Sequence, residues 1–330
     1  MCLAERRDCW EMGGHSLTKY DQTTRLPELK RVDIRFAEVQ AQVLQNVVNR
    51  LDRTFADFFR RIKNNEQAGY PRFKPSRRYD SFTYPQAYKQ GCKLKGNRLE
   101  LTKIGPIKIK LHRPIEGKIK TVTIHRQADG WYALFACEVE PKVLPASDES
   151  VGVDLGLESF AITSGGEFFP SPKYLKKAEK NLKRLHRQVD RRKKGSNRRK
   201  KAVNQFAKAH LHVADQRKDN AHKVARSLVN RYGTIAVEDL AVANMVKNHH
   251  LAGAISDAGW STFLKILTDK AVEAGRQVIK VDPRNTSQLC SQCGAMVKKP
   301  LWQRQHVCPE CGLNIHRDVN AAINILKRAA

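Results

Sequence analysis

Four cysteines near the carboxyl end have the most specific spacing in the chain. They form two CxxC pairs, CSQCG at 290–294 and CPECG at 308–312, with fourteen residues between the pairs. Thiolates at this spacing are typical of a tetrahedral zinc site, and the glycine after each pair leaves room for a tight turn. Four sulfurs fill every coordination position of zinc. We therefore expect one structural zinc ion, bound by Cys290, Cys293, Cys308 and Cys311.

Three isolated acids form the second chemical feature. Asp154 and Glu238 each end an apolar, β-branched run, and Asp318 begins the apolar segment DVNAAINIL. The carboxyl ends of strands in an open α/β sheet border the crevice where ligands bind, so we expect these acids to converge there. Carboxylates suit Mg²⁺ or Mn²⁺, and two such ions about 3.5–4 Å apart would activate water and stabilise the leaving 3′ oxygen of a phosphodiester.

Each acid also has a structural interpretation. Asp318 could be a helix N-cap, Glu238 could accept backbone hydrogen bonds, and Asp154 could fix a turn. Arg317 beside Asp318 could stabilise phosphate charge or lie on the surface. The joint occurrence of three such acids in a basic segment favours metal binding.

The charge balance indicates a polyanionic partner. The 330 residues include 61 Lys and Arg against 33 Asp and Glu, a net charge of +28, with a pI near 10.0. Because the charge is spread over segments with folded patterns, nucleic acid is favoured over a basic tail or an anionic membrane. There is no apolar run of about eighteen residues and no apolar signal region at residues 1–8, so we expect a cytoplasmic protein without membrane partners. In that compartment Cys2, Cys9, Cys92 and Cys137 would be free thiols.

Two basic segments are candidates for nucleic-acid contact. Residues 69–88 interleave aromatic and basic side chains, as stacking on unpaired bases and phosphate neutralisation would require, although the aromatics could equally anchor a loop. Residues 191–201 gather eight cations around Gly195. The expected contacts are Tyr70, Arg72, Phe73, Lys74, Arg77, Arg78, Arg191, Arg192, Lys193, Lys194, Arg198, Arg199, Lys200 and Lys201.

The amino-terminal half divides into a helical and a strand-rich part. Apolar residues three and four apart predict an amphipathic helix or helix pair over 29–63. Residues 93–143 read as short strands separated by turns, which predicts a small antiparallel barrel. Its buried faces would include the pairs Val122/Ile124 and Leu134/Ala136. A linker is expected over 141–149.

From Val151 onward strands and helices alternate. A hairpin turn is expected at 165–166, then two helices over 175–189 and 203–228 joined near 195–197. The strand ending at Glu238 follows, then a polar loop at 244–256, a helix at 260–274, a strand at 277–281, the cysteine unit and a last helix. This order predicts an α/β fold with a ribonuclease-H-like nuclease layout.

Several motifs resemble the TnpB (OrfB) proteins of insertion sequences, relatives of type V CRISPR effectors. The similar stretches are VGVDLG, AVEDLAVANM, NTSQLCSQCG with CPECG, HRDVNAAINIL and GYPRFKPSRRYDSFTYPQ, so the resemblance covers nearly the whole chain. It implies a RuvC-like nuclease domain at 149–330 with a basic helical hairpin at 172–231 and a zinc ribbon at 285–315. It further implies a wedge-like barrel at 91–148 and a helical recognition lobe with its basic connector at 1–90.

The resemblance also implies an activity. Members of the family use a guide RNA from the transposon end to cleave target DNA beside a short transposon-adjacent motif. The matching catalytic acids are Asp154, Glu238 and Asp318, and the matching cysteines bind zinc in an insertion that binds target nucleic acid. A cytoplasmic, nucleoid-associated bacterial or archaeal protein follows, with a monomer slightly favoured.

Two departures from the family pattern bear on activity. Family members usually begin with a basic strand and a further helix, whereas this chain starts close to the stretch GHSLTKYDQTTRLPELK, so the amino terminus resembles a truncated one. His316 stands where an acidic residue is common. The alternative function is therefore a truncated, non-cleaving nucleic-acid-binding regulator, or an inactive remnant.

Overall fold

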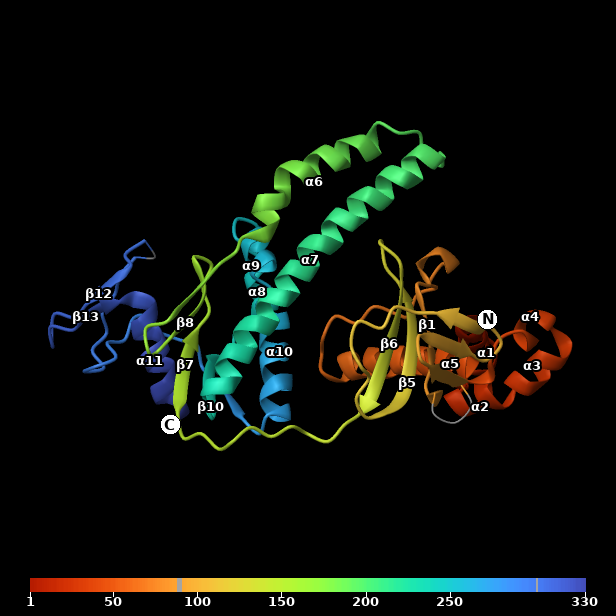
Figure 1. Ribbon diagram of the computed structural model, residues 1–330, viewed down its shortest axis with the longest axis horizontal. Helices are drawn as coiled ribbons and strands as arrows, with labels where there is room; N and C mark the ends of the chain where they lie inside the picture. The colour runs from red at the N-terminus through yellow and green to blue at the C-terminus, as the bar shows by residue number, and fades with distance from the viewer. Residues whose placement is uncertain (88–90, 301) are drawn as a thin grey trace. The chain divides into compact units, whose positions relative to one another are not determined.

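A computed structural model describes residues 1–87, 91–300 and 302–330, and the side chain of Arg77 lies outside the described part (Figure 1). The chain divides into two compact units, Met1–Glu140 and Pro141–Ala330. Helices and strands occur in both, so the predicted mixed α/β class is confirmed.

Five helices open the first unit. They are α1 (Cys2–Gly13), α2 (Lys19–Thr24), α3 (Leu26–Val32), α4 (Ile34–Ala37) and α5 (Ala41–Lys63). The prediction of one helix or a helix pair over 29–63 was wrong. Asp33 adopts an extended conformation and its carboxylate accepts a hydrogen bond from the Arg35 N–H, and the Gln40 side chain caps α5. These two caps divide the region into three helices, although the apolar spacing runs through it.

The strands of the first unit form two antiparallel sheets. One has the order β1-β5-β6 and the other β2-β3-β4. Their bounds are β1 (Ser81–Tyr84), β2 (Cys92–Lys95), β3 (Arg98–Leu101), β4 (Gly105–Lys108), β5 (Lys118–Arg126) and β6 (Trp131–Glu138). Both sheets contribute to one core, with Tyr84 and Val122 from the first and Leu99 and Leu101 from the second. The predicted antiparallel strands are confirmed.

The predicted buried face of β6 was wrong by one residue. Leu134 is 52% exposed, whereas Phe135 packs against the core. The reason is the register, because Val122 of β5 lies opposite Phe135 and Ile124 opposite Ala133. Residues directly opposite each other share a face, so a shift of one residue reverses the burial of the whole strand.

A five-stranded sheet forms the centre of the second unit. Its strands are β7 (Ser150–Asp154), β8 (Ser159–Thr163), β9 (Phe168–Pro170), β10 (Thr234–Glu238) and β11 (Gln277–Val281), in the order β11-β10-β7-β8-β9. β7, β10 and β11 run parallel, and β8 pairs antiparallel with both β7 and β9. The predicted turn at 165–166 joins β8 to β9.

Helices pack on both faces of this sheet (Figure 1). The helices of this unit are α6 (Tyr174–Asp190), α7 (Asn197–Arg231), α8 (Val242–Met245), α9 (Ala252–Ala258), α10 (Trp260–Glu273) and α11 (Arg317–Ala329), of which α6 packs along α7. Ile235 and Val237 of β10 face the core shared with α7 and α10, and Ala236 between them contacts the α11 side through Ile325. The predicted polar loop at 244–256 was wrong in part, because the end of α8 and most of α9 lie within it and Ile255 is buried.

The cysteine unit lies between β11 and α11. Its two short strands, β12 (Gln305–Val307) and β13 (Asn314–His316), pair antiparallel. Among the described helices, none is long and apolar enough to cross a membrane.

Candidate active site and metal centres

Asp154 and Glu238 end neighbouring parallel strands of the second unit. Asp154 is the last residue of β7 and Glu238 the last of β10, and Val153 pairs with Val237 just before them. Side chains alternate along a strand, so Asp154 shares a face with Gly152, and Glu238 shares a face with Ala236. Ala236 contacts the α11 side, so both carboxylates lie on the face that α11 covers.

Asp318 reaches this edge because α11 packs directly on β7. A Cβ built on Gly152 would overlap the carbonyl oxygen of Ala322, so only glycine permits this approach. Asp318 lies four residues before Ala322, on the same helix face and one turn nearer to the helix start. Asp154 lies two residues beyond Gly152. The two acids are therefore brought together at the same end of the strand and helix pair.

The charges of the other two acids act on Asp154. Burial raises the pKa of Asp154 well above its ordinary value, and repulsion from Glu238 and then Asp318 raises it further, against a smaller opposing effect of Arg317. Burial also raises the pKa of Glu238, while a hydrogen bond from Thr286 and the charge of Arg328 lower it. Glu238 is 7% exposed and the Asp318 side chain 16%.

Asp318 is not a helix N-cap, and Arg317 beside it is buried. His316, not Asp318, is the N-cap of α11, and its Nδ1 accepts a hydrogen bond from the Asp318 N–H at 3.3 Å. Arg317 is not on the surface, because it is 5% exposed and donates to Pro300 O and Ser287 Oγ. The Asp318 side chain is thus free of capping and has Arg304 as its ion-pair partner at 3.8 Å.

The donor set of the three acids fits a hard divalent cation. All three offer carboxylate oxygens, the ligands that Mg²⁺ and Mn²⁺ prefer, and their mutual repulsion is the kind that a bound cation relieves. They are less tightly gathered than the cysteines. Among the described residues, only the four cysteines form a group of three or more metal-binding side chains with ligand atoms within 4.8 Å of one another.

The cysteine cluster fits a tetrahedral metal. Cys290 Sγ and Cys311 Sγ are 3.5 Å apart, and Cys293 Sγ and Cys308 Sγ are 3.6 Å apart. Zinc–sulfur bonds of about 2.3 Å in a tetrahedron require sulfur–sulfur distances of about 3.8 Å. The backbone is shaped for this, since Gly294 and Gly312 have positive φ and donate to the carbonyls of Cys290 and Cys308.

A buried histidine and lysine lie behind this cluster. His306 is fully buried, and its Nδ1 contacts Lys299 Nζ, itself 7% exposed. Burial raises the pKa of Cys290, but hydrogen bonds from the Cys293 N–H and then the His306 ring outweigh it and lower that pKa to about 5. A thiolate is the form that binds metal. The sequence prediction named the four cysteines and missed these two partners.

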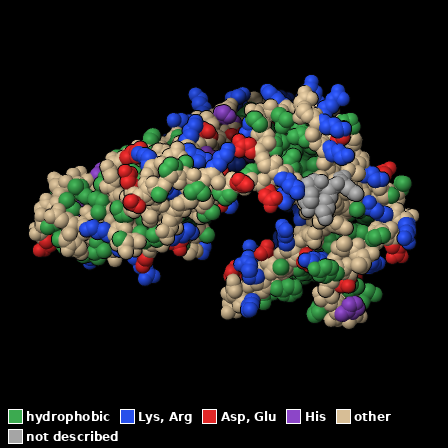
Figure 2. Space-filling model, turned by 60° about the horizontal axis from the view of Figure 1, so that its bottom comes forward, with side chains coloured by type: hydrophobic (Ala, Val, Ile, Leu, Met, Phe, Trp, Pro, Cys, Tyr) green, Lys and Arg blue, Asp and Glu red, His purple; other side chains and the backbone are tan. Residues whose placement is uncertain are grey.

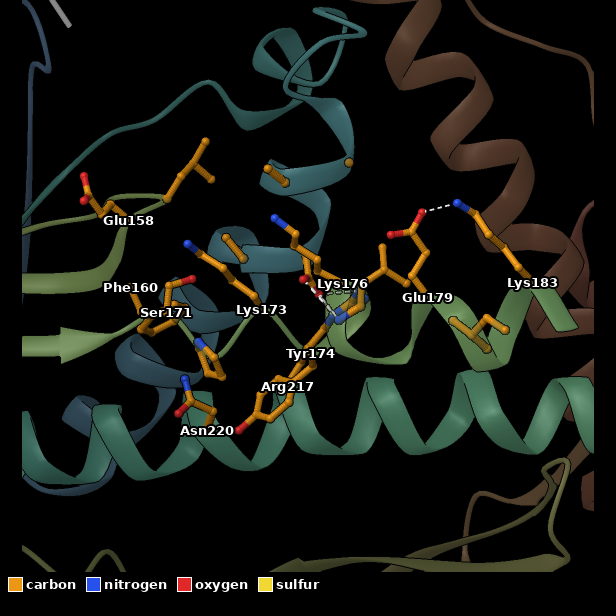
Figure 3. Close-up of a pocket in the computed structure, with 18 of the residues that line it drawn as sticks. Glu158, Phe160, Ser171, Lys173, Tyr174, Lys176, Glu179, Lys183, Arg217 and Asn220 are labelled. Carbon is orange, nitrogen blue, oxygen red and sulfur yellow. Dashed lines mark hydrogen bonds and ion pairs between the residues drawn. The ribbon is translucent and has the colours of Figure 1, made fainter. Parts of the chain in front are cut away.

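A cavity of about 760 Å³ in the second unit is lined from β8, α6, α7 and α9 (Figure 3). Lys173, Lys176 and Arg217 are among its lining residues, and Asp257 in its wall binds Arg217 at 2.6 Å. Arg304 connects the cavity to the acids, because it lines the cavity and pairs with Glu158 at 2.6 Å and with Asp318. Sequence reasoning missed Arg304 and Asp257, which no motif distinguishes.

The connector residues of the first unit are mostly exposed. Tyr70 and Phe73 are 49% and 59% exposed, and Tyr70 also packs edge-on against Phe55 and Phe58 of α5. Lys74 Nζ lies over the Tyr79 ring. Arg72 and Arg78 are exposed, and the expectation for Arg77 lies outside the described side chains.

The predicted cluster of cations lies at the tip of the α6–α7 hairpin. Arg191, Arg192, Lys193, Lys194, Arg198, Lys200 and Lys201 are exposed. Arg199 is half-buried and donates to the carbonyls of Val189 and Arg192, where it closes the end of α6. Lys and Arg side chains also recur over the face shown in Figure 2.

The fold and site define a mixed α/β protein with two acids at the ends of neighbouring parallel strands of a mixed sheet and a thiolate cluster beside its last helix. Residues 134–249 match a family model described as a probable transposase, OrfB of the IS605 type, and residues 260–325 match a Cas12f1-like TNB domain.

Two relatives align over most of the chain. A protein of Streptomyces pristinaespiralis named "Putative RNA-guided DNA endonuclease" is 34% identical, over 98% of this chain and 78% of its own length. The InsQ protein of Escherichia coli K12, with the same description, is 33% identical over 87% of this chain and 74% of its own. A protein chain in a solved CRISPR-Cas12f ternary complex aligns over 98% of this chain and 78% of its own length, at 16% identity. The TM-score is 0.43, which is too low to establish a shared fold. The chain belongs to the TnpB (OrfB) family.

Proposed function

We propose that this chain is a transposon-associated, RNA-guided DNA endonuclease of the TnpB type that hydrolyses DNA phosphodiesters. The relatives that it matches over most of their length carry that description. Its partners would be a guide RNA and a target DNA, in keeping with the net charge of +28.

The observation that carries the proposal is the convergence of Asp154, Glu238 and Asp318. These acids come from β7, β10 and α11, and two of them have pKa values raised by burial at one sheet edge. A stable core has no need for such a cluster, because like charges at close range are costly. Buried acids with perturbed pKa values are typical of catalytic sites.

In this mechanism the three carboxylates would hold two Mg²⁺ or Mn²⁺ ions. When bound, such ions activate a water and stabilise the leaving oxygen of the phosphodiester. Thr286 would orient Glu238. Arg304 would offer Nη1 of its guanidinium to the DNA backbone, since that nitrogen lies 3.8 Å from Asp318 while Nη2 pairs with Glu158.

The thiolate cluster would hold one structural zinc ion. Its sulfur spacing supports tetrahedral Cys₄ binding, which leaves no open position for catalysis. The finer architecture belongs to the proposal as well. We assign residues 149–330 to a RuvC-like domain with the ribbon at 285–315, residues 91–148 to a wedge-like barrel, and residues 1–90 to a recognition lobe and connector.

The test is a cleavage assay. The protein would be copurified with RNA transcribed from the transposon end and incubated with a plasmid matching the guide, with and without Mg²⁺. Mg²⁺-dependent cutting that Asp154→Ala abolishes is the expected result. The exposed Asp148 provides a matched control, and Asp148→Ala should cut normally.

The rival function gives a different outcome. A truncated, non-cleaving regulator would retain RNA in the copurification and yet leave a matched plasmid intact in Mg²⁺ and in Mn²⁺. That result would overturn the proposed nuclease activity and leave nucleic-acid binding as the function.

A further inference from the structure

The six residues Thr286–Ser291, which include Cys290 of the first cysteine knuckle, form a connector. They hydrogen-bond both to Glu238 and to α11. Thr286 Oγ1 lies 2.6 Å from Glu238 Oε1, and these residues are 4% and 7% exposed. Cys290, a ligand in the proposed zinc site, lies four residues further along.

The direction of the Thr286 hydrogen bond follows from its single proton. Its hydroxyl has two acceptors within reach, Glu238 Oε1 at 2.6 Å and Pro283 O at 3.2 Å. A distance of 2.6 Å is typical of a hydroxyl donating to a carboxylate, and such bonds are about twice as strong as neutral ones. The hydroxyl therefore donates mainly to Glu238 and restricts the rotation of that carboxylate.

The same segment is bound to the helix that carries Asp318. Asn320 Oδ1 accepts from the Ser291 N–H at 2.8 Å, and its Nδ2 donates to Leu289 O at 2.7 Å. Asn324 Nδ2 lies 2.8 Å from both Thr286 O and Leu289 O, and Lys327 Nζ donates to Ser291 O at 2.6 Å. Asn320 and Asn324 are buried, so these bonds are shielded from water.

We propose that Thr286 is a positioning residue for Glu238, and that the segment Thr286–Ser291 fixes Glu238 relative to Asp318 by joining both to the first cysteine knuckle. The inference rests on the proposed function, because it assumes that these acids bind a divalent cation. It assigns the cysteine unit a second role, which is to hold two of the three acids in register.

Mn²⁺ binding to the full chain tests this inference, measured by electron paramagnetic resonance without nucleic acid. Thr286→Val removes the hydroxyl at nearly constant shape and should weaken Mn²⁺ binding by about 10–100-fold, the usual effect of losing a group that orients a metal ligand. Thr286→Ser keeps the hydroxyl and should bind within about threefold of the unaltered protein. Thr268→Val, which removes a hydroxyl bonded to Leu264 O in α10, is the control and should bind normally.

The zinc content of each variant shows whether weaker Mn²⁺ binding comes from a misplaced Glu238 or from unfolding of the cysteine unit. Each variant should retain one zinc per chain, because Thr286 touches no cysteine in the hydrogen bonds described above. If Thr286→Val does not fold, Asn320→Ala is the second test of the inference. It removes two hydrogen bonds between α11 and the segment Thr286–Ser291 and leaves Thr286 in place. It should weaken Mn²⁺ binding while Glu238 and Asp318 remain intact.

The outcomes distinguish this inference from the function on which it rests. No Mn²⁺ binding by the unaltered protein would overturn the proposed carboxylate site together with the inference. Normal Mn²⁺ binding by the unaltered protein and equal binding by folded Thr286→Val would overturn the inference alone.

Discussion

The two candidate metal centres are assembled in different ways. The four cysteines come from two short loops eighteen residues apart, counted from Cys290 to Cys308, and their ligand atoms lie within 4.8 Å of one another. The three acids come from β7, β10 and α11, and the first and last are separated by 164 positions (318 − 154). The cysteine cluster thus depends on local turns, whereas the acid site depends on the packing of the whole second unit.

This difference decides how each centre responds to change. Loss of a cysteine should disrupt a small region strongly, because that region buries few apolar side chains of its own. Loss of an acid should leave the fold intact and remove only metal binding and cleavage. The following changes test the contrast, from the largest expected effect to the smallest.

Cys308→Ser should cause the largest loss of local stability. Zinc binding contributes on the order of 10–16 kcal/mol in finger peptides, and Cys308 is fully buried in the cluster. Zinc content should fall below one per chain, and hydrogen exchange should become fast over residues 286–316 while it stays slow in β7 and β10. Cys137→Ser, at a free and partly exposed thiol, is the control. Retention of zinc and of slow exchange in Cys308→Ser would contradict the local dependence.

Gly152→Ala should damage the acid site through packing. The added methyl would overlap Ala322 O, a backbone atom that cannot rotate away, so α11 must shift from β7. We expect a loss of about 2 kcal/mol or more in the free energy of unfolding, together with a large loss of cleavage. Gly253→Ala in α9, where no atom lies within 4 Å of the new methyl, is the matched control for denaturant unfolding. Equal stability of the two variants would show that α11 does not depend on close contact at Gly152.

Asp154→Asn should stabilise the metal-free protein while abolishing cleavage. The folded protein raises the pKa of Asp154, so it binds a proton more tightly than the unfolded chain does. Stability from this group is therefore present below the ordinary pKa of aspartate and is lost as pH rises toward the folded value. The difference in the free energy of unfolding between the variant and the unaltered protein should therefore increase from about pH 4 to pH 8. Each kcal/mol of that difference should raise the Tm of the variant by about 2–4 °C.

The control for that measurement is Asp148→Asn. Its side chain is exposed near the start of β7, so its melting temperature should follow that of the unaltered protein at every pH. A fall in the melting temperature of metal-free Asp154→Asn at pH 8 would mean that the carboxylate stabilises the fold, as a structural acid would.

Neutralising Arg191 and Lys194 should have the smallest effect. If the hairpin tip contacts phosphates, the slope of log affinity for nucleic acid against log salt should decrease by about 0.7–0.9 for each lost contact. Lys208 and Lys218, further along α7, are suitable comparison residues. An unchanged slope would mean that the tip is a solvated surface.

The contrast between the two centres also explains what the sequence could predict. Cys290 to Cys311 are recognisable by spacing alone, and Asp154 and Glu238 stand out because polar residues end apolar strands. Thr286, Arg304 and Gly152 could not be found this way, since their roles depend on contacts across 48, 14 and 170 positions, to Glu238, Asp318 and Ala322. Only the stretch NTSQ before the first cysteine pair marked Thr286, and only as part of a family resemblance.

The errors in the predicted elements have local physical causes. Helix spacing runs through residues 29–63, but the side chains of Asp33 and Gln40 cap new helices within it. Alternation along β6 allows either face to be buried, and the register with β5 selects Ala133 and Phe135. The periodicity of apolar residues indicates whether a segment is a helix or a strand. Where a helix begins and which face of a strand is buried depend on single contacts, such as caps and the pairing register.

Mn²⁺ binding to Asp154→Asn, Glu238→Gln and Asp318→Asn, each compared with the unaltered protein at one zinc per chain, tests the central claim most directly. A single site built by all three acids predicts that each substitution weakens Mn²⁺ binding strongly and that zinc content does not change. Unchanged Mn²⁺ binding in any one of the three variants would contradict a shared carboxylate site.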